Sequence, residues 1–181
     1  MLILVVPATN GQLFNDATQE FLSTKEAVLQ LEHSLVSVSK WESKWKKPFL
    51  NSDKTIEESL DYIKCMTINH NVDDTVYRVM TNDLMQQVMD YISDSMTATT
   101  ITKDLADRQS REVITAEIIY YWMIAQNVPF ECRKWHLNKL LTLIRVCAIK
   151  NAPPKKMKRG EIMSRNKALN AARRAQLGTS G

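Results

Sequence analysis

The basic residues of this chain are concentrated at its C-terminal end. This charge pattern divides the chain into a body that can form an apolar core and a tail that has few apolar residues for one. From Lys150 to Gly181 there are nine Lys and Arg and one acid, a net charge of +8. Residues 1–149 hold fifteen bases and nineteen acids, a net charge of −4. We therefore expect one mildly acidic globular domain over residues 1–150 and a cationic tail over 151–181 that acts by electrostatics.

The composition of the body favours a helical protein. Apolar residues make up 44% of the 181 residues, which is enough for a core and too many for intrinsic disorder. Four glycines and five prolines are too few for an all-β sandwich or barrel. The three cysteines are far apart and form no Cys-x-x-Cys pair, which predicts buried thiols in a reducing compartment.

The N-terminal residues predict a small β-hairpin rather than a signal peptide. The apolar run Leu2–Pro7 has no preceding basic residues, so we interpret it as a strand. Turn-forming residues follow, and Gln19–Leu22 can return as a second strand, which places a hairpin in residues 1–23. The longest apolar stretch, Val113–Ala125, is too short to span a bilayer and contains Glu117, so no membrane association is expected.

Capping boxes and apolar periodicity predict five to six helices in the body and a helical tail. The box Ser23–Glu26 is expected to begin a helix that runs through Trp45 and ends before Pro48. The box Thr55–Glu58 is expected to begin the next one. Residues 97–102 are either a third strand or a plain connection. Further helices are expected after Asp73-Asp74, after a cap at Thr81 or Asn82, from Ser110 through residues 112–126, over residues 131–150, and over residues 161–177. The inward side chains of the helix over 131–150 are expected to be Leu137, Leu140, Leu141, Ile144 and Cys147.

The helix over residues 112–126 is expected to be the centre of the core. Apolar residues surround nearly its whole circumference, which is typical of a buried helix. We expect it to pack against the helices at 26–45 and 133–149. Pro129 separates it from the following helix, and Pro153-Pro154 ends that helix and begins the tail.

No constellation of residues predicts an enzyme, a metal site or a cofactor site. The histidines His33, His70 and His136 have no metal-ligand spacing, and His136 is expected to be a satisfied or semi-exposed helix residue. Glu117 in the apolar helix is a weak catalytic candidate, because burial raises a carboxyl pKa; an ion pair or a boundary position is the favoured interpretation. We therefore expect a non-enzymatic protein with no catalytic residue.

Two segments are candidates for binding a partner. Trp41 and Trp45 are four residues apart and share a helix face among lysines, so they form either a core corner or an aromatic and basic contact surface. The tail has no aromatic residue for base stacking, so sequence-specific binding of nucleic acid is not expected. The tail could bind nucleic acid non-specifically through phosphates, dock on an acidic protein surface, or stay solvated. The tail residues that we expect to contact a partner are Ile162, Met163, Arg165, Leu169, Arg173 and Arg174.

A resemblance sharpens these expectations. The runs SLVSVSKWESKWKKPFL, IIYYWMIAQNVPFECRKWHLNKLLTLI and KKMKRGEIMSRNKALNAARRAQLG resemble virion-assembly proteins of tailed bacteriophages, and in particular the tail assembly chaperones of long-tailed phages. The resemblance covers the chain from about Glu26 to its end. It implies binding to the tape measure protein, a long helical chain, or to tail tube subunits, in the host cytoplasm during assembly. It implies no cofactor and no catalytic residue.

A second class of function stays open beside the chaperone. A structural virion component, such as a head-tail or tail completion protein, would use the basic tail to anchor itself in the particle. A free nucleic-acid-binding regulator is a third class. The sequence leaves open the client, self-association, and a frameshifted longer form of the kind that the chaperone resemblance suggests.

Overall fold

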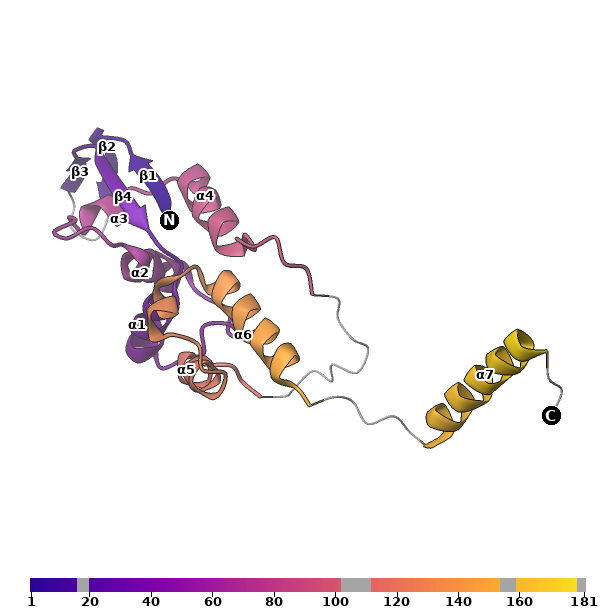
Figure 1. Cartoon of the computed structure of the whole chain (residues 1–181). Helices are drawn as coiled ribbons and strands as arrows, with labels where there is room; N and C mark the ends of the chain where they lie inside the picture. Colours follow the sequence, from indigo (N-terminus) through magenta and orange to yellow (C-terminus); the bar gives the residue numbers. More distant parts are fainter. Residues whose placement is uncertain (16–19, 102–111, 154–158, 179–181) are drawn as a thin grey trace. The chain divides into compact units, whose positions relative to one another are not determined.

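The computed structural model describes residues 1–15, 20–101, 112–153 and 159–178 (Figure 1). The chain forms two compact units, Met1–Lys150 and Asn151–Gly181. This division falls at the residue where the charge of the sequence changes. The chain is mainly helical, with a small antiparallel hairpin at its N-terminus and a helix at its C-terminus, which is the fold class expected from the sequence.

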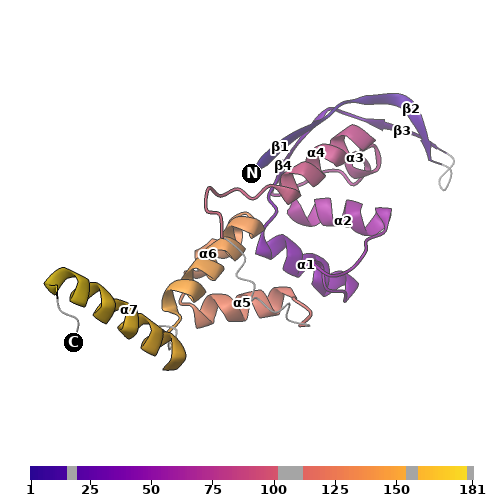
Figure 2. The ribbon, with the colours of Figure 1, turned by 90° about the vertical axis from the view of Figure 1, so that its right-hand side faces the viewer.

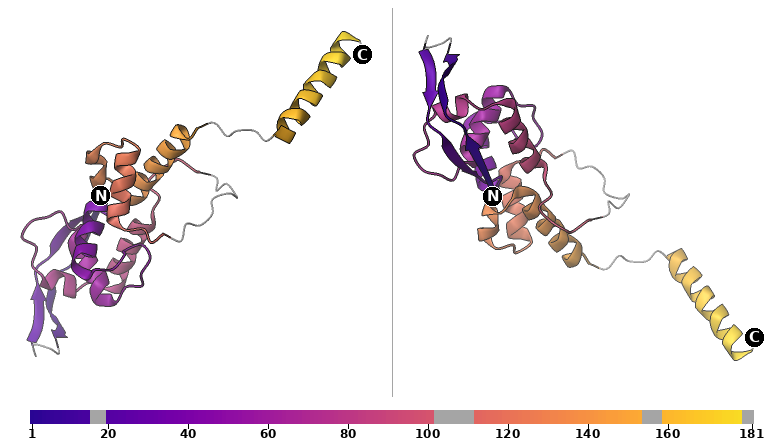
Figure 3. Two further views of the ribbon diagram at one scale, coloured as in Figure 1. Left: turned by 90° about the horizontal axis from the view of Figure 1, so that it is seen from below. Right: turned by 90° about the horizontal axis from the view of Figure 1, so that it is seen from above.

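The hairpin consists of two strand pairs in series. Strand β1 (Leu2–Val6) pairs antiparallel with β4 (Ala27–Leu31), and β2 (Thr9–Asn15) pairs antiparallel with β3 (Glu20–Thr24). Inward side chains alternate with outward ones along β1 and β4, as expected for a ribbon with one covered face. Helices α3 and α4 lie against this ribbon (Figures 2 and 3). The buried side chains of β1 and β4 are Leu4, Val6, Leu29 and Leu31.

The hairpin is longer than predicted, and the helix expected from Ser23 is wrong in its first part. The hairpin continues to Leu31 instead of ending at residue 23, so the box Ser23–Glu26 begins no helix. The apolar residues at 28 and 31 fit a helix and a strand equally well by their spacing. Pairing with β1 decides between them, because it places Leu29 and Leu31 in the core opposite Leu4 and Leu2.

Helix α1 (Leu35–Trp45) begins at a capping box made by two serines. The Ser34 hydroxyl accepts from the Ser37 amide at 3.3 Å, and the Ser37 hydroxyl accepts from the Ser34 amide at 2.9 Å. The helix ends at Lys46, which has a left-handed φ of 54° and donates its N–H to the Glu42 carbonyl. Its predicted end before Pro48 is confirmed.

The next three helices begin where the sequence predicts. Helix α2 (Ile56–Met66) has the Thr55–Glu58 capping box, and Thr81 caps α4 (Asn82–Ser93). The short α3 (Thr75–Arg78) follows Asp73 and Asp74. The described part of the Thr-rich segment, up to Ile101, is a connection without strand structure.

The apolar helix of the sequence is α5 (Ala116–Ala125), and its expected burial on all sides is wrong. It is shorter than predicted, with Thr115 as its N-cap residue, and Ser110 lies outside the described residues. Ala116, Ile119 and Met123 are buried, whereas Tyr121 is 66% and Ile124 is 65% exposed. The physical reason is position: α5 lies at the edge of the body and packs on α1 with one face (Figure 2).

The helix predicted over residues 131–150 forms in two parts. A 3₁₀ helix, η1 (Phe130–Lys134), comes first, and α6 (Leu137–Asn151) follows and ends before Pro153. Leu137, Leu140 and Ile144 are buried as predicted, and Leu141 and Cys147, also predicted to face inward, are half-buried against the core. The Leu137 amide donates to the His33 carbonyl at 2.7 Å, which joins the start of α6 to the segment that leads from β4 into α1.

The second unit contains α7 (Arg159–Leu177), close to the predicted helix over 161–177. Gly178 follows it with a φ of +63°, the left-handed conformation that often ends a helix and that glycine adopts without steric cost. No residue of α7 is buried.

Candidate functional site

The tryptophan pair of α1 belongs mainly to the core. Trp41 is fully buried, and its indole N–H donates to the Glu58 carbonyl of α2 at 2.9 Å. The hypothesis that Trp41 contacts a partner is therefore wrong, and the core-corner interpretation holds for it. Trp45 is half-buried, and its indole N–H donates to an Asp61 carboxylate oxygen at 2.9 Å.

The lysines near these tryptophans are engaged with α2. Lys44 forms an ion pair with Asp61, and Lys47 forms one with Glu58. The hydrogen bond from Lys47 is the main cause that holds the pKa of Glu58 below its ordinary value. These ion pairs and indole hydrogen bonds join α2 to α1 and to Lys47, which follows the C-cap of α1. The aromatic and basic segment therefore serves chiefly to connect two helices.

Glu42 is a buried acid that the sequence analysis missed. One carboxylate oxygen accepts from the Phe49 amide and the other from the Ala116 amide, each at 2.7 Å. The carboxylate thus satisfies the backbone at the start of α5, which is a structural role. Nothing in the sequence near Glu42 indicates it, because Ala116 is 74 residues away. Glu117, the former catalytic candidate, is exposed in the first turn of α5, a boundary position.

Two histidines form a buried cluster that the sequence also did not reveal. The rings of His33 and His136 are 5.0 Å apart between centroids, and the side chains are 2% and 4% exposed. His33 Nδ1 and the Tyr62 hydroxyl share a hydrogen bond of 2.5 Å, and His136 Nε2 donates to the Tyr91 carbonyl at 3.0 Å. His136 Nδ1 is buried without a hydrogen-bond partner, so the expectation of a semi-exposed or satisfied His136 is wrong.

Burial favours the neutral forms of His33 and Tyr62 in this cluster. Burial, with a smaller contribution from the adjacent His136, lowers the pKa of His33 to about 3. Burial also raises the pKa of the Tyr62 hydroxyl. Within the described ranges, no three His, Cys, Asp or Glu side chains are grouped so that they could hold a metal ion. The cluster therefore offers packing and hydrogen bonding among β4, α2, α4 and α6.

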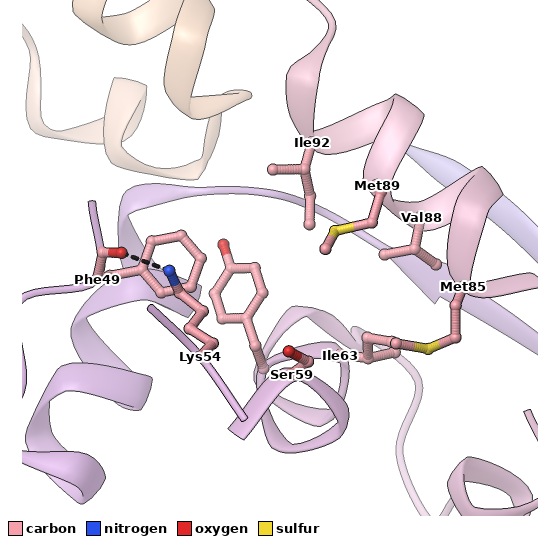
Figure 4. A pocket seen from close by; sticks show the side chains of 9 residues that line it. Phe49, Lys54, Ser59, Ile63, Met85, Val88, Met89 and Ile92 are labelled. Atoms are coloured by element: carbon pink, nitrogen blue, oxygen red, sulfur yellow. Dashed lines mark hydrogen bonds between the residues drawn. The ribbon is translucent and has the colours of Figure 1, made fainter. Parts of the chain in front are cut away.

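An apolar cleft of about 230 Å³ lies between α2 and α4 (Figure 4). At its wall the Lys54 ammonium donates to the Phe49 carbonyl at 2.6 Å and lies 4.2 Å from the centre of the Phe49 ring. Burial lowers the pKa of Lys54. Since its amine is held by backbone carbonyls, Lys54 closes one side of the cleft. The lining residues are Phe49, Lys54, Ser59, Tyr62, Ile63, Met85, Val88, Met89 and Ile92.

The predicted contact residues of the tail all lie on α7 and are exposed, but they do not share one side. Ile162 and Leu169 are seven residues apart, which brings them to one face of the helix, and Arg173 follows Leu169 by one turn. Met163 and Arg174 are eleven residues apart and lie together on the neighbouring face, along a shallow groove with Lys167 and Asn170. Each face thus pairs apolar side chains with cations.

Comparison with protein-family models, with curated proteins and with solved structures finds no match to this chain. Among the helices that the structure describes, none combines the length and the apolarity needed to cross a bilayer.

Proposed function

We propose that this protein is a non-enzymatic assembly factor that binds a helical client through α7, in the manner of a phage tail assembly chaperone. The observation that supports the proposal is that α7 has 19 residues and none of them is buried. A single helix of this length is only marginally stable in water and gains most of its stability by packing an apolar face. The apolar face that α7 offers a partner contains Ile162 and Leu169, which are 43% and 47% exposed.

The charge of the tail indicates what kind of client surface α7 would bind. Basic side chains lie beside the apolar ones along α7, and Glu161 is the only acid between Lys150 and Gly181. An apolar groove bordered by carboxylates would complement both properties, as in helix-in-groove recognition. The resemblance to tail assembly chaperones makes the tape measure protein the first client to test, and a tail tube protein the second.

Co-expression with the tape measure protein of the same phage tests this proposal. Without this chain, the tape measure protein is expected to be insoluble. With the full chain, it should become soluble and co-purify. A chain that lacks residues 151–181 should lose both effects while its body stays folded. Unchanged co-purification with the truncated chain would refute the role of α7.

A pair of variants makes the test specific to one face. The double variant Ile162→Asp, Leu169→Asp should reduce binding of the client strongly, because both changes place carboxylates on the apolar face. The double variant Ala168→Asp, Ala175→Asp is the matched control, because it makes the same change in charge at the same seven-residue spacing. Both alanines are exposed and lie on the side of α7 away from Ile162 and Leu169 and outside the groove of Met163 and Arg174. Binding should survive in this control.

A structural role in the virion is the second candidate, and the net charge of +8 in the tail supports it. A cationic tail without aromatic residues can hold packaged nucleic acid or an acidic capsid surface by charge alone, with a strong dependence on salt. The two candidates differ in what happens to the protein after assembly: a chaperone leaves the particle, and a structural component stays in fixed copy number.

A further inference from the structure

Helix α5 exposes an aromatic face that its composition would place in an interior. Its ten residues are apolar except for Glu117 and the tyrosine hydroxyls, and a helix that is apolar all round is normally covered on all sides. Among the described residues of the body, α5 buries Ala116, Ile119 and Met123, and Tyr120 and Trp122 are half-buried against the core. The outward face continues onto η1, and together they form what we call the α5 patch: Glu117, Tyr120, Tyr121, Ile124, Phe130 and Arg133.

The contacts within the patch show that it is one ordered surface. The rings of Tyr120 and Phe130 stack with centroids 5.6 Å apart and an interplanar angle of 16°. The Arg133 guanidinium lies over Phe130, 5.3 Å from the ring centre. Tyr121 and Ile124 are three residues apart on the helix and are therefore neighbours, with about two thirds of each side chain exposed.

The composition of the patch is that of a protein interface. Tyrosine, phenylalanine and arginine are enriched at the centres of interfaces, where a few such side chains supply most of the binding energy. Exposed apolar side chains elsewhere on the body, such as Ile56, do not have stacked aromatic neighbours of this kind in the described contacts. A contiguous apolar surface rimmed by charge indicates a binding face.

The charges of the patch favour a second copy of this chain as the occupant. In a two-fold symmetric interface a surface meets itself, so a surface with charge of one sign would be repelled. The α5 patch has one acid, Glu117, and one base, Arg133. Burial raises the pKa of Tyr120, and of the two nearby charges Arg133 lowers this pKa and Glu117 raises it. A two-fold axis through the patch can bring Glu117 of each protomer toward Arg133 of the other.

We propose that the protein is a homodimer in which the α5 patches of two copies pack against each other. The assignment uses only residues of the body, so it does not depend on the proposed role of α7. It gives the exposed side of α5 an apolar cover that the described residues of the body do not supply. It also accounts for the mixed charge of the patch, which an acidic or a basic client would not require.

Sedimentation equilibrium of the full chain, under reducing conditions so that free cysteines form no disulfide, tests the proposal. The wild-type mass should approach twice 20.8 kDa as the concentration rises. The double variant Tyr121→Asp, Ile124→Asp should weaken the dimer about thirtyfold or more, because hot-spot residues are lost. Since both side chains are exposed, each monomer should keep its far-UV circular dichroism. Ile56→Asp, at a side chain that is 80% exposed outside the patch, should dimerise as the wild type does.

A charge exchange separates this dimer from other forms of self-association. Glu117→Arg or Arg133→Glu alone should weaken the dimer, because like charges then meet across the axis, and the two changes together should restore it. A wild-type chain that stays monomeric at all concentrations would overturn the proposal. A dimer that persists in the Tyr121→Asp, Ile124→Asp variant would also overturn it, and would show that another surface associates.

Discussion

At the scale of single residues, His33 makes the stability of the body depend on pH. The folded-state pKa of His33 is lowered to about 3 by burial, whereas the unfolded chain takes up this proton near the ordinary value of 6.5. Between these values only the unfolded state binds the proton, so acid favours unfolding. The contribution of neutral His33 is complete above pH 6.5 and is lost progressively as the pH falls toward 3, at up to about 1.4 kcal/mol per pH unit.

Urea unfolding between pH 7.5 and 5 measures this dependence. The free energy of unfolding of the wild type should fall as the pH falls below about 6.5, where unfolded histidine takes up its proton. His33→Gln should flatten this slope, although it lowers stability at every pH because the bond to Tyr62 changes. His70→Gln is the control, since His70 is exposed, and it should keep the wild-type slope. An equal slope in wild type and His33→Gln would contradict the assignment.

The sequence was least informative about the burial and the partners of single polar residues. Glu42 bonds the Ala116 amide, and His33 packs on His136, across separations that no local pattern reveals. The types of these residues are common on helix surfaces, and only the fold places them inside. By contrast, the burial of Leu137 and Leu140 follows directly from helical periodicity, and it was predicted.

At the scale of elements, the first helix shows why a capping motif alone does not locate a helix. The sequence offers Ser23–Glu26, with the favoured Glu at the third helical position, and Ser34–Ser37, without it. The chain uses the second, because β4 is held in the sheet by β1 and its residues cannot also be helical. At Thr55 and Thr81 no strand competes, and the predicted starts are confirmed.

Removing the two candidate caps tests this account. Ser34→Ala should lower the free energy of unfolding by about 1 kcal/mol, since the Ser37 amide loses its acceptor at the start of α1. Ser23→Ala removes no helix cap, because Ser23 lies in β3, and it should lower stability less than Ser34→Ala does. Chemical denaturation of both variants gives the comparison. A larger loss for Ser23→Ala than for Ser34→Ala would contradict the assignment of the cap.

Helix α5 illustrates a different limit of prediction. Its composition indicates burial on all sides, and the structure provides cover on one side. Periodicity reports which residues avoid water and does not report whether the same chain or another molecule covers them. The sequence predicts that α5 is buried on all sides, and the body buries one face of it. The proposed dimer interface would bury the other face.

At the scale of the whole molecule, the division into an acidic body and a basic helical tail follows from the charge pattern, and the structure has its unit boundary at the same point. The mainly helical class with an N-terminal hairpin was also predictable. The pairing of β1 with β4 and the one-sided burial of α5 were not, because they depend on long-range contacts.

If both proposals hold, a dimer of bodies presents two α7 helices to one long client, which raises the effective concentration of the second contact.

Quantitative mass spectrometry of purified phage particles, beside the infected-cell lysate, tests the proposed function most directly. The account predicts that peptides of this chain are abundant in the lysate during assembly and absent from finished particles, as expected for a chaperone that leaves its client. A fixed number of copies in every particle would contradict the chaperone proposal and would assign the basic tail to a structural anchor.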